Sequence, residues 1–373
     1  MTHPIRYGLV GTGMMGREHL QNIALLVDAE AAALFDPDAG ELAAASELAP
    51  AARQHDSFES LTADPDIDCL LIASPNHLHA DQLEAALSRR TLPVLIEKPL
   101  YTAAEDEARI ARIMARNPLV WVAMEYRYMP PISMLLAEVE RATGGIKMLT
   151  IREHRYPFLT KVGDWNRFNR NTGGTLVEKC CHFFDLMRLI LRAEPVRVMA
   201  SAGQAVNHLD ERYGGEKPDI WDHGYVIVDF DSGARAMLEL CMFAEGSRFQ
   251  EEISAVGPRG KIEARVPGPT RFWPDHLGDP PTSEIVISPR SPSGPQTLDV
   301  TVPELLLEAG DHNGSTFYQH LRFADMVRRG GTPEVTLHDG MMAVRMGLAA
   351  QRSAETGEAV AVVSEPATET VSA

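Results

Sequence analysis

The sequence predicts two domains: an open α/β domain with a doubly wound parallel sheet, then an α+β domain with a large, mostly antiparallel sheet. Over the first 125 residues, apolar segments alternate with helix-like segments, as in a parallel sheet covered on both faces. A glycine-rich turn joins the first strand to the first helix. After residue 125, strand-like segments follow one another without helices between them. The length of 373 residues also exceeds a single ordinary core.

The first domain, residues 1–125, is expected to contain five buried strands with helices between them. The strands are short apolar runs bounded by turn residues, at 5–10, 31–36, 67–74, 92–97 and 119–124. Helix-like segments begin near Arg17 and cover 41–48, 79–90 and 103–116. In such a sheet, ligands bind beyond the carboxyl ends of the strands.

The second domain, residues 126–363, is expected to be built on consecutive strands at 147–156, 196–206, 225–230, 234–243, 251–257 and 261–266. Three helices interrupt it, at 176–192, about 314–329 and about 339–354. Residues 288–297 predict a loop because of their serine, proline and glycine content. The last residues, 364–373, predict a disordered tail.

Composition and charge argue against several classes of protein. The formal net charge of −17 disfavours nucleic acid and anionic membranes as partners, because both require basic patches. No apolar run approaches the ~18–20 residues of a membrane span, and the chain enters its first strand without a signal peptide. Four cysteines without CxxC spacing are typical of a reduced protein, so a cytoplasmic location is expected.

The segment GTGMMG, which spans Gly11 to Gly16 and includes Met14 and Met15, has the spacing of a dinucleotide-binding turn. Gly11 would permit the tight turn, Gly13 would let the backbone approach a pyrophosphate, and Gly16 would let the helix pack close to the sheet. The amide groups at the helix N-terminus would hold the phosphates. A merely structural turn is the alternative, and the strand before it and the helix after it argue against that reading.

Asp36, at the end of the second predicted strand, lies 20 residues after Gly16. An acid in this position binds the adenosine ribose hydroxyls and would repel a 2′-phosphate. Pro37 and Asp38 follow, so the next residues offer no arginine to receive such a phosphate. NAD is therefore expected as the cofactor in preference to NADP. A capping role for Asp36 at the helix that begins near Asp38 is compatible with this function.

Two loops at the same edge of the sheet carry further functional groups. In SPNHLHA, Ser74, Pro75 and Asn76 would place a turn against the cofactor. His77 and His79 either contribute to that site or simply begin the next helix.

In the second loop, IEKPL, Glu97 and Lys98 follow a buried strand, and Pro99 ends that strand and leaves Lys98 aimed into the crevice. A partly buried lysine can have a lowered pKa and act as a general acid or base. Spacing alone leaves a surface or ion-paired lysine as the alternative.

Together, GTGMMG with His19, Asp36, SPNHLH, EKP and EYRYMP resemble the Gfo/Idh/MocA oxidoreductases, the relatives of glucose–fructose oxidoreductase and inositol 2-dehydrogenase. The resemblance extends over nearly the whole chain. It implies an N-terminal Rossmann domain, a C-terminal open-sheet domain that commonly mediates oligomers, and a nicotinamide cofactor. It also implies a sugar, inositol, sugar acid or related polyol as substrate, and a homodimer or homotetramer is expected.

The resemblance also implies roles for individual residues. It makes Lys98 catalytic, it places Glu178 and His182 at the substrate, and it puts Arg127 of EYRYMP near the domain junction and the cofactor. Because a polyol needs several donors and acceptors, Tyr156 and Asp164 are further candidates for contact with the substrate. The expected cofactor contacts are Gly11, Gly13, Met14, Met15, Gly16, Asp36, Ser74, Pro75, Asn76, His79, Glu97, Lys98 and Arg127.

The stretch LVEKCCHFFDLM is predicted to be a helix that starts after the TGG break. Spacings of four and three residues put Glu178, His182 and Asp185 on one face, while Lys179 and Cys180 point elsewhere. Adjacent cysteines on a helix diverge by about 100°, so a metal site is not expected. A purely structural helix is the remaining alternative. The family pattern is close to Asp-x-Gly-x-His, and the Glu-Lys-Cys-Cys sequence departs from it.

The predicted chemistry is hydride transfer from a secondary alcohol carbon to the nicotinamide, while the hydroxyl loses its proton. Lys98 and His182 are the candidates for holding that hydroxyl and exchanging its proton, and Glu178 would orient His182 or bind a neighbouring hydroxyl. Two alternatives are a glycoside hydrolase that acts by transient oxidation with bound NAD, and a non-catalytic nucleotide-binding regulator. The joint presence of Lys98 and His182 argues against the regulator.

Overall fold

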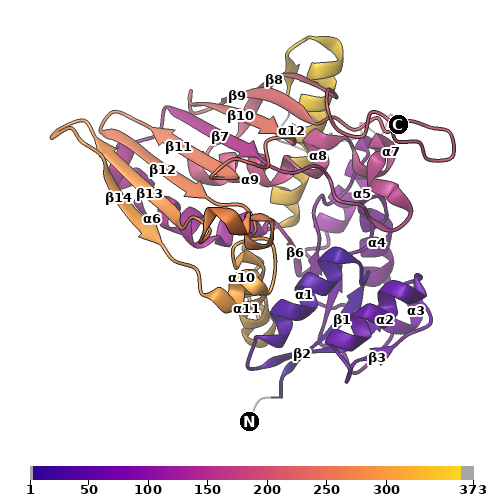
Figure 1. The fold of residues 1–373 in the computed structure, drawn as a ribbon. Coiled ribbons are helices and arrows are strands. Elements are labelled where there is room, and N and C mark those ends of the chain that lie inside the picture. Colours follow the sequence, from indigo (N-terminus) through magenta and orange to yellow (C-terminus); the bar gives the residue numbers. More distant parts are fainter. Residues whose placement is uncertain (1–2, 363–373) are drawn as a thin grey trace.

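Two β-sheets organise the chain in a computed structural model, which describes residues 3–362 (Figure 1). The expected tail at 364–373 lies outside the described residues. The first sheet belongs to the N-terminal part, drawn in indigo and violet, and the second sheet fans out at the upper left of the view. The fold class predicted from the sequence is confirmed, because a parallel sheet is followed by a mostly antiparallel one.

The first sheet has six strands in the order β3-β2-β1-β4-β5-β6, and every neighbouring pair is parallel. Its order reverses between β1 and β4, which opens a crevice at the carboxyl ends of these strands. Sequence reasoning missed β3, whose two exposed polar residues carry no apolar signal. The strands are β1 (Ile5–Val10), β2 (Ala29–Phe35), β3 (Arg53–Gln54), β4 (Cys69–Ile72), β5 (Val94–Ile96) and β6 (Val120–Val122).

Helices separate these strands as predicted, except for the short helix at 58–62, which was missed. Three short 3-10 turns lie at the sheet edge where the crevice opens or just beyond it: η1 (Asn76–Leu78), η2 (Ala104–Asp106) and η3 (Glu125–Tyr128). The helices are α1 (Met14–Ala24), α2 (Ala39–Leu48), α3 (Phe58–Thr62), α4 (His79–Arg89) and α5 (Glu107–Met114).

The second sheet has nine strands in the order β14-β13-β12-β11-β7-β10-β9-β8-β15. The pair β7 and β10 is parallel, and the other neighbouring pairs are antiparallel. The strands are β7 (Met148–His154), β8 (Pro195–Gly203), β9 (His223–Phe230), β10 (Arg235–Cys241), β11 (Glu251–Val256), β12 (Gly260–Val266), β13 (Ser283–Pro289), β14 (Gln296–Val300) and β15 (Val360–Ala361).

The two faces of the second sheet differ in burial. Side chains alternate between faces with a period of two, and in β9 Val226 and Val228 are fully buried while Tyr225 and Ile227 are 55% and 41% exposed. The helices that pack on the sheet are α6 (Pro130–Thr143), α9 (Cys181–Leu191) and α12 (Leu337–Thr356). The buried face is therefore the one that these helices cover, and the opposite face is open.

The C-terminal helices return to the first sheet. Helix α11 (Ser315–Arg329) packs against α1, β1 and η3, and α12 contacts α5 and β6. Figure 1 shows α10 (Glu304–Glu308) and α11 beside α1, although some 290 residues separate them in sequence. Side chains from both ends of the chain therefore meet near the crevice of the first sheet.

Two predictions of local structure were wrong, and a third is confirmed in part. Helix α6 was missed, although Pro130 at its start and Gly144 in a left-handed conformation (φ 67°) at its end are typical helix boundaries. The loop predicted at 288–297 is confirmed over 290–295, where it forms a hairpin tip, but its ends belong to β13, which extends to Pro289, and to β14, which begins at Gln296. The helix predicted at 176–192 is divided into α8 (Thr175–Glu178) and α9, and Lys179 and Cys180 form the junction.

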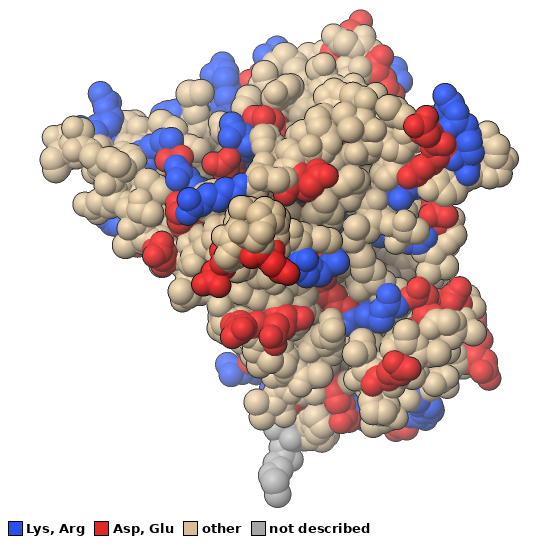
Figure 2. Space-filling model, in the orientation of Figure 1, with Lys and Arg blue, Asp and Glu red and all other residues tan. Residues whose placement is uncertain are grey.

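The remaining short helical elements are α7 (Asn169–Thr172), η4 (Val162–Arg167), η5 (Thr270–Phe272) and η6 (Asp275–Leu277). Within residues 3–362, no helix is long and apolar enough to cross a membrane. Acidic and basic side chains are interspersed on the face of the molecule that Figure 2 shows, where neither sign forms a continuous patch.

Candidate active site

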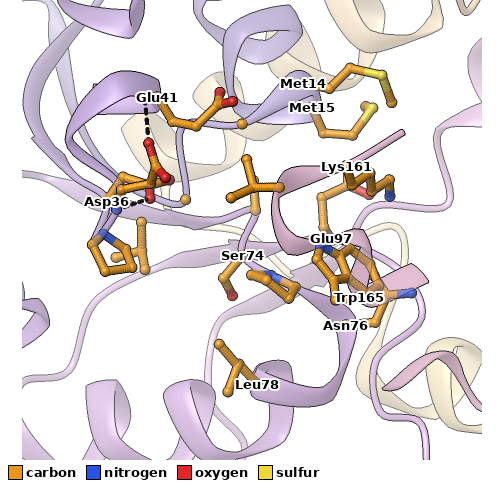
Figure 3. A pocket seen from close by; sticks show the side chains of 18 of the residues that line it. Met14, Met15, Asp36, Glu41, Ser74, Asn76, Leu78, Glu97, Lys161 and Trp165 are labelled. Carbon is orange, nitrogen blue, oxygen red and sulfur yellow. Dashed lines mark hydrogen bonds between the residues drawn. The ribbon is translucent and has the colours of Figure 1, made fainter. Parts of the chain in front are cut away.

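A deep cleft lies at the carboxyl ends of β1, β2, β4 and β5, where the strand order reverses (Figure 3). The glycine turn forms one wall, the segment that follows β4 forms another, and η4 of the second part closes it. Its lining residues are Val10, Gly11, Gly13, Met14, Met15, Arg17, Phe35, Asp36, Pro37, Asp38, Glu41, Ala73, Ser74, Pro75, Asn76, Leu78, Gln82, Glu97, Lys98, Thr160, Lys161, Val162 and Trp165.

Each of the three glycines in the turn is required for a different structural reason. Gly11 adopts a φ of 89°, and a Cβ there would lie 2.5 Å from the backbone nitrogen of Ser74. A Cβ on Gly16 would lie 2.2 Å from the carbonyl oxygen of Gly11, so Gly16 permits close packing of α1. A Cβ on Gly13 would meet nothing within 4 Å, because Gly13 borders the open cleft. The turn therefore leaves room for a ligand at the start of α1.

The start of α1 suits an anionic ligand. Gly13 is the N-cap residue, no side chain caps the helix, and the first turn contains no acidic residue. The first amide groups of a helix lack partners within it and carry a partial positive charge. A phosphate group is the kind of ligand that satisfies both, so the residues present fit a dinucleotide pyrophosphate.

The far end of the cleft is acidic. One carboxylate oxygen of Asp36 accepts hydrogen bonds from the backbone N–H (2.7 Å) and hydroxyl of Thr12, and the other accepts from the N–H of Asp38 (2.9 Å). The cap of α2 is Asp38, which accepts from the N–H groups of Gly40 and Glu41, so a capping role for Asp36 was wrong. Figure 3 shows Asp36 and Glu41 at this end, opposite Lys161 and Trp165.

Sequence reasoning missed Arg17, which borders the same end of the cleft. Arg17 lies on the first turns of α1, and its guanidinium is paired with Glu41 of α2. A phosphate-binding arginine is expected after the second strand, whereas Arg17 precedes that strand in the sequence. A position on α1 that points to the same end of the cleft is visible only when the helix is placed next to β2.

The segment after β4 forms the middle of the cleft. Ser74, Pro75 and Asn76 line it, and the side-chain nitrogen of Asn76 is buried without a hydrogen-bond partner among the described residues. His79 does not line the cleft: it is fully buried, and its ring nitrogens lie 2.7 Å from the carbonyl oxygen of Pro99 and 2.9 Å from that of Ser74. The expected cofactor contact of His79 is therefore corrected, since its ring ties two loops together beneath the cleft.

A smaller inner pocket continues from the cleft and shares Met14, Met15, Lys98 and Lys161 with it. It lies between the first sheet and the α8–α9 junction, and the second part of the chain supplies most of its wall. Its lining residues are Met14, Met15, Glu18, Lys98, Tyr126, Arg155, Tyr156, Phe158, Leu159, Lys161, Glu178, Lys179, His182, Asp311 and His312. The predicted residues Lys98, Glu178, His182 and Tyr156 are thus brought together.

Lys98 lies at the point where cleft and inner pocket meet. Its Nζ donates to the carbonyl oxygen of Glu178 at 3.4 Å, which links β5 to the end of α8. Burial alone would lower the pKa of Lys98, but Cys181, Glu97 and Glu178 outweigh burial and raise the pKa above its ordinary value. The lowered pKa that partial burial suggested is therefore corrected: Lys98 is a cation at neutral pH.

His182 is the second predicted catalytic group, and it is a neutral ring. Burial, followed by the nearby charges of Lys98 and Lys179, lowers the pKa of His182 well below its ordinary value. Its ring is stacked on that of Tyr126, with centroids 4.0 Å apart and planes inclined by 7°. The Nδ1 atom of His182 is buried without a hydrogen-bond partner among the described residues, so a ligand can supply one.

Glu178 faces the same pocket. Its Oε1 lies 3.6 Å from Nζ of Lys161, and its Oε2 is buried without a hydrogen-bond partner among the described residues. The contacts of Glu178 in the described part of the chain do not include the ring of His182. Glu178 is consequently better placed to accept a hydrogen bond from a ligand than to orient His182.

Lys179 corrects the prediction that it points away from the site. The junction between α8 and α9 turns it into the inner pocket, where it is 4% exposed. Its Nζ lies 2.7 Å from the hydroxyl of Tyr126 and 2.8 Å from Oε1 of Glu153. Burial and the charge of Arg155 lower the pKa of Lys179 to about 8. A continuous helix was assumed in the prediction, and the interruption changes the direction of this side chain.

Arg127 and Asp185 belong to neither cavity. The Nε of Arg127 donates to Asp185 at 2.6 Å, and Arg127 also lies 3.5 Å from Asp339, so the group joins η3, α9 and α12. The expected cofactor contact of Arg127 is corrected, as is the expectation that Asp185 shares a face with His182 in the site. The charges of Arg127 and Asp185 neutralise each other in a buried ion pair outside the inner pocket.

Asp164, a predicted substrate contact, also lies outside both cavities. It occupies a left-handed conformation (φ 51°) within η4, and its neighbour Trp165 is the residue that lines the cleft. Tyr156 does line the inner pocket, and its ring contacts that of Phe272 at 4.4 Å. Sequence spacing cannot predict which of two adjacent residues in an irregular turn, Asp164 or Trp165, faces the cleft.

Sequence reasoning missed His312, a charged residue that lines the inner pocket. Nδ1 of His312 lies 2.6 Å from Oε1 of Glu18 and 3.5 Å from Oε1 of Glu125. Burial lowers the pKa of His312, but Glu18 and Glu125 outweigh it and raise the pKa to about 9. The polar run GDHNG before α11 was an available signal, but its distance along the chain from Lys98 concealed its place in the fold.

Behind the pocket, a chain of buried side chains connects the two ends of the sequence. Nε2 of His19 lies 3.0 Å from Oε1 of Glu97, and its Nδ1 lies 2.8 Å from Nε2 of His320. The backbone N–H of Lys98 donates to the other carboxylate oxygen of Glu97. His19 from α1 and His320 from α11 thus fix the residue that precedes Lys98. Over residues 3–362, no group of three or more His, Cys, Asp or Glu side chains is arranged to hold a metal ion.

Two sequence models of one protein family match almost the whole chain. "Oxidoreductase family, NAD-binding Rossmann fold" matches residues 5–126, and "Oxidoreductase family, C-terminal alpha/beta domain" matches residues 140–362. Inositol 2-dehydrogenase of Corynebacterium glutamicum is 34% identical over 74% of this chain and 78% of its own length. Myo-inositol 2-dehydrogenase of Thermotoga maritima is 25% identical over 95% of this chain and 98% of its own length.

Solved structures share the fold. A levoglucosan dehydrogenase in complex with NADH and levoglucosan superposes with a TM-score of 0.78 and 20% identity, covering 96% of this chain and 100% of that chain. At this identity the likeness concerns the arrangement of the two sheets and the helices.

Proposed function

The chain belongs to the Gfo/Idh/MocA family of NAD(P)-dependent dehydrogenases, and on that premise we propose that it oxidises a secondary hydroxyl of a sugar, inositol or related polyol with NAD. The observation that carries this proposal is the inner pocket. There Lys98, a partly buried cation, lies with two buried polar atoms that have no hydrogen-bond partner among the described residues, Nδ1 of His182 and Oε2 of Glu178, where the inner pocket meets the cleft. The curated relatives named as inositol dehydrogenases support the same substrate class.

The residues that would hold NAD line the cleft. The amide groups at the start of α1 would hold the pyrophosphate, and Gly13 would leave room for it. Asp36 would accept hydrogen bonds from the adenosine ribose. Asp38 and Glu41 add negative charge at that end of the cleft. Glu41 also forms an ion pair with the nearby Arg17, which makes that guanidinium less available to a phosphate. A 2′-phosphate would be repelled there, which favours NAD over NADP.

NAD held in the cleft would supply the acceptor for the hydride that leaves the substrate carbon. The protein would hold the hydroxyl on that carbon between Nζ of Lys98 and the neutral ring of His182. As the hydride leaves, His182 would take the hydroxyl proton and the charge of Lys98 would stabilise the negative charge that develops on oxygen. Glu178 would accept a hydrogen bond from a neighbouring hydroxyl of the substrate.

The open face of the second sheet supports assembly into a homodimer or homotetramer. Tyr225 and Ile227 of β9 and Met148 of β7 are exposed on the strands, and Met148 is 61% exposed. Apolar side chains on an uncovered sheet favour burial against a second copy.

The proposal is tested with a panel of sugars and inositols, each assayed with NAD and with NADP for formation of the reduced nucleotide. Net reduction of NAD coupled to loss of a secondary alcohol is expected. Cleavage of glycosides without net reduction of NAD would instead indicate hydrolysis by transient oxidation. Binding of NAD without any turnover would indicate a regulator.

A further inference from the structure

Basic side chains dominate one end of the inner pocket. The acids that line the pocket have partners of their own: Glu18 is bound by His312, Asp311 by Arg271 and Glu178 by Lys161. The cations Arg155 and Lys179 lie together at the end that is bounded by Tyr126 and Tyr156. This end is not used by the hydride-transfer step proposed above.

Arg155 and Lys179 share one carboxylate. Nη1 of Arg155 and Nζ of Lys179 lie 3.5 Å and 2.8 Å from the same oxygen, Oε1 of Glu153. Glu153 is completely buried on the covered face of β7 and does not line the pocket. The two cations therefore face the pocket, while the charge that compensates them lies behind.

A second carboxylate lies behind the cations but compensates them only in part. Glu251 of β11 is the direct cross-strand neighbour of Glu153, and both side chains are buried. Burial and the charge of Glu153 raise the pKa of Glu251 to about 7, so Glu251 is partly protonated at neutral pH. The carboxylates that compensate Arg155 and Lys179 therefore do not line the pocket, and the sides of both cations that face the pocket are open to an anionic ligand.

We infer that Arg155 and Lys179 form a subsite for a carboxylate of the substrate, so that the substrate is a sugar acid or another carboxylated polyol. This inference rests on the proposed function. A carboxylate offers two coplanar oxygens, which match the planar fork of an arginine together with one ammonium group. A neutral polyol would leave both cations without an anionic partner in the pocket, which is unfavourable where water is largely excluded.

Tyr126 sets the spacing between the two halves of the site. Its ring is stacked on His182, and its hydroxyl lies 2.7 Å from Nζ of Lys179. The ring of His182 and Nζ of Lys179 thus lie 4.0 Å and 4.9 Å from the centroid of the Tyr126 ring, which places the two halves of the site side by side. A carboxyl group a few carbons from the oxidised carbon fits this spacing.

The inference is tested with matched pairs of substrates that differ in one carboxyl group, D-glucose with D-glucuronate and D-galactose with D-galacturonate, each with saturating NAD. The acids are expected to have kcat/KM values about 10- to 100-fold higher than their neutral partners, as the loss of a charged hydrogen bond would predict. In Arg155→Gln and Lys179→Met this preference should collapse. Arg155→Lys should retain part of it.

The control is Arg170→Gln, which removes the same charge from an exposed arginine that is paired with Glu216 on the surface. This variant should keep the preference for acids. Circular dichroism and thermal melting of each variant separate loss of the subsite from loss of the fold. Calorimetric titration of D-glucuronate and D-galacturonate into the protein with NADH adds a readout that does not depend on turnover.

The outcomes distinguish failure of this inference from failure of the proposed function. Equal kcat/KM for acid and neutral partner would overturn the carboxylate subsite and leave the dehydrogenase proposal standing. Preference for D-glucose 6-phosphate over D-glucuronate would overturn it in favour of a phosphate subsite. Arg155-dependent binding of an acid without any oxidation would uphold the subsite and contradict the proposed function. Absence of both binding and oxidation for every acid would overturn the inference.

Discussion

Burial and neighbouring charges decide what each side chain of the inner pocket can do. Lys98 stays cationic because acids and a thiol surround it, whereas His182 stays neutral because it is buried beside two lysines. This is the opposite of a site in which a neutral lysine acts as the base. At the scale of single residues, the proposed mechanism would therefore pass the proton of the substrate to His182, and the charge of Lys98 would stabilise the oxygen that is left.

The preference for NAD is predicted to depend on the charge of Asp36. Asp36→Asn keeps an oxygen that can accept from the N–H of Thr12, and so preserves the turn while removing the charge. We expect the ratio of kcat/KM for NAD over NADP to fall about 10-fold, because repulsion of the 2′-phosphate is lost. Adding Glu41→Ala should lower it further by freeing Arg17. Asp66→Asn, on the surface, serves as the control, and an unchanged ratio in Asp36→Asn would mean that another residue sets the preference.

The ion pair between Glu18 and His312 is predicted to make stability depend on pH. The pKa of His312 is raised to about 9 in the folded chain, against about 6.5 in an unfolded chain. Its stabilising effect is therefore complete below pH about 6.5 and is lost as the pH rises through about 9. Chemical unfolding should show His312→Gln to be less stable than wild type by about 2–3 kcal/mol at pH about 6.

That difference should shrink to near zero at pH about 10, where His312 is neutral in both states. A difference that stays the same at both pH values would contradict the assignment of a charged His312.

At the scale of elements, regular patterns were predicted well and junctions were not. The alternation of apolar strands and helices identified five strands of the first sheet, since β1, β4, β5 and β6 are buried on both faces and β2 is an apolar run. The α8–α9 junction was missed because Leu176, Val177, Phe183 and Phe184 keep an apolar pattern across it. Lys179 enters the pocket only because of that junction. Likewise, Arg127 belongs to the EYRYMP motif, but it forms an ion pair with Asp185 instead of contacting the cleft. That contact depends on tertiary packing.

The glycine turn is predicted to separate folding from cofactor binding. Gly13→Ala should fold normally, because its Cβ meets nothing within 4 Å, yet weaken NAD binding, because the Cβ would enter the cleft. Gly16→Ala should destabilise the fold by about 1–3 kcal/mol or more, because its Cβ would meet the carbonyl oxygen of Gly11. Thermal melting with and without NAD measures both effects.

The control for this pair is Gly246→Ala, where a Cβ also meets nothing within 4 Å. It should melt and bind NAD like the wild type. Stabilisation of Gly13→Ala by NAD to the same extent as wild type would show that Gly13 does not border the bound pyrophosphate.

At the scale of the whole molecule, the site forms because C-terminal segments of the chain pack against the first helix and the first strand. Helix α11 brings His320 against His19, and the segment before it brings His312 against Glu18. The second sheet contributes Arg155 at the end of β7, and the α8–α9 junction contributes Lys179. These long-range meetings could not be predicted from spacing, whereas the family resemblance did predict that Lys98, Glu178 and His182 would converge.

The open face of the second sheet is predicted to hold the assembly together. Tyr225→Asp with Ile227→Asp should convert the proposed homo-oligomer into monomers, because two charges would be placed in an apolar interface. Sedimentation equilibrium measures the mass of each species. Val27→Asp, at a fully exposed apolar residue on the first part of the chain, is the control and should leave the mass unchanged. A wild-type chain that sediments as a monomer would contradict the proposal.

The central claim is that the Lys98 charge is required for oxidation of the substrate, and the most direct measurement is rapid mixing of NAD-loaded protein with the best substrate of the panel. Lys98→Met should still bind NAD, as titration of tryptophan fluorescence would report, but should reduce it about 1000-fold more slowly than wild type. Lys147→Met, at an exposed lysine, should behave like wild type. Reduction of NAD by Lys98→Met at the wild-type rate would contradict the claim.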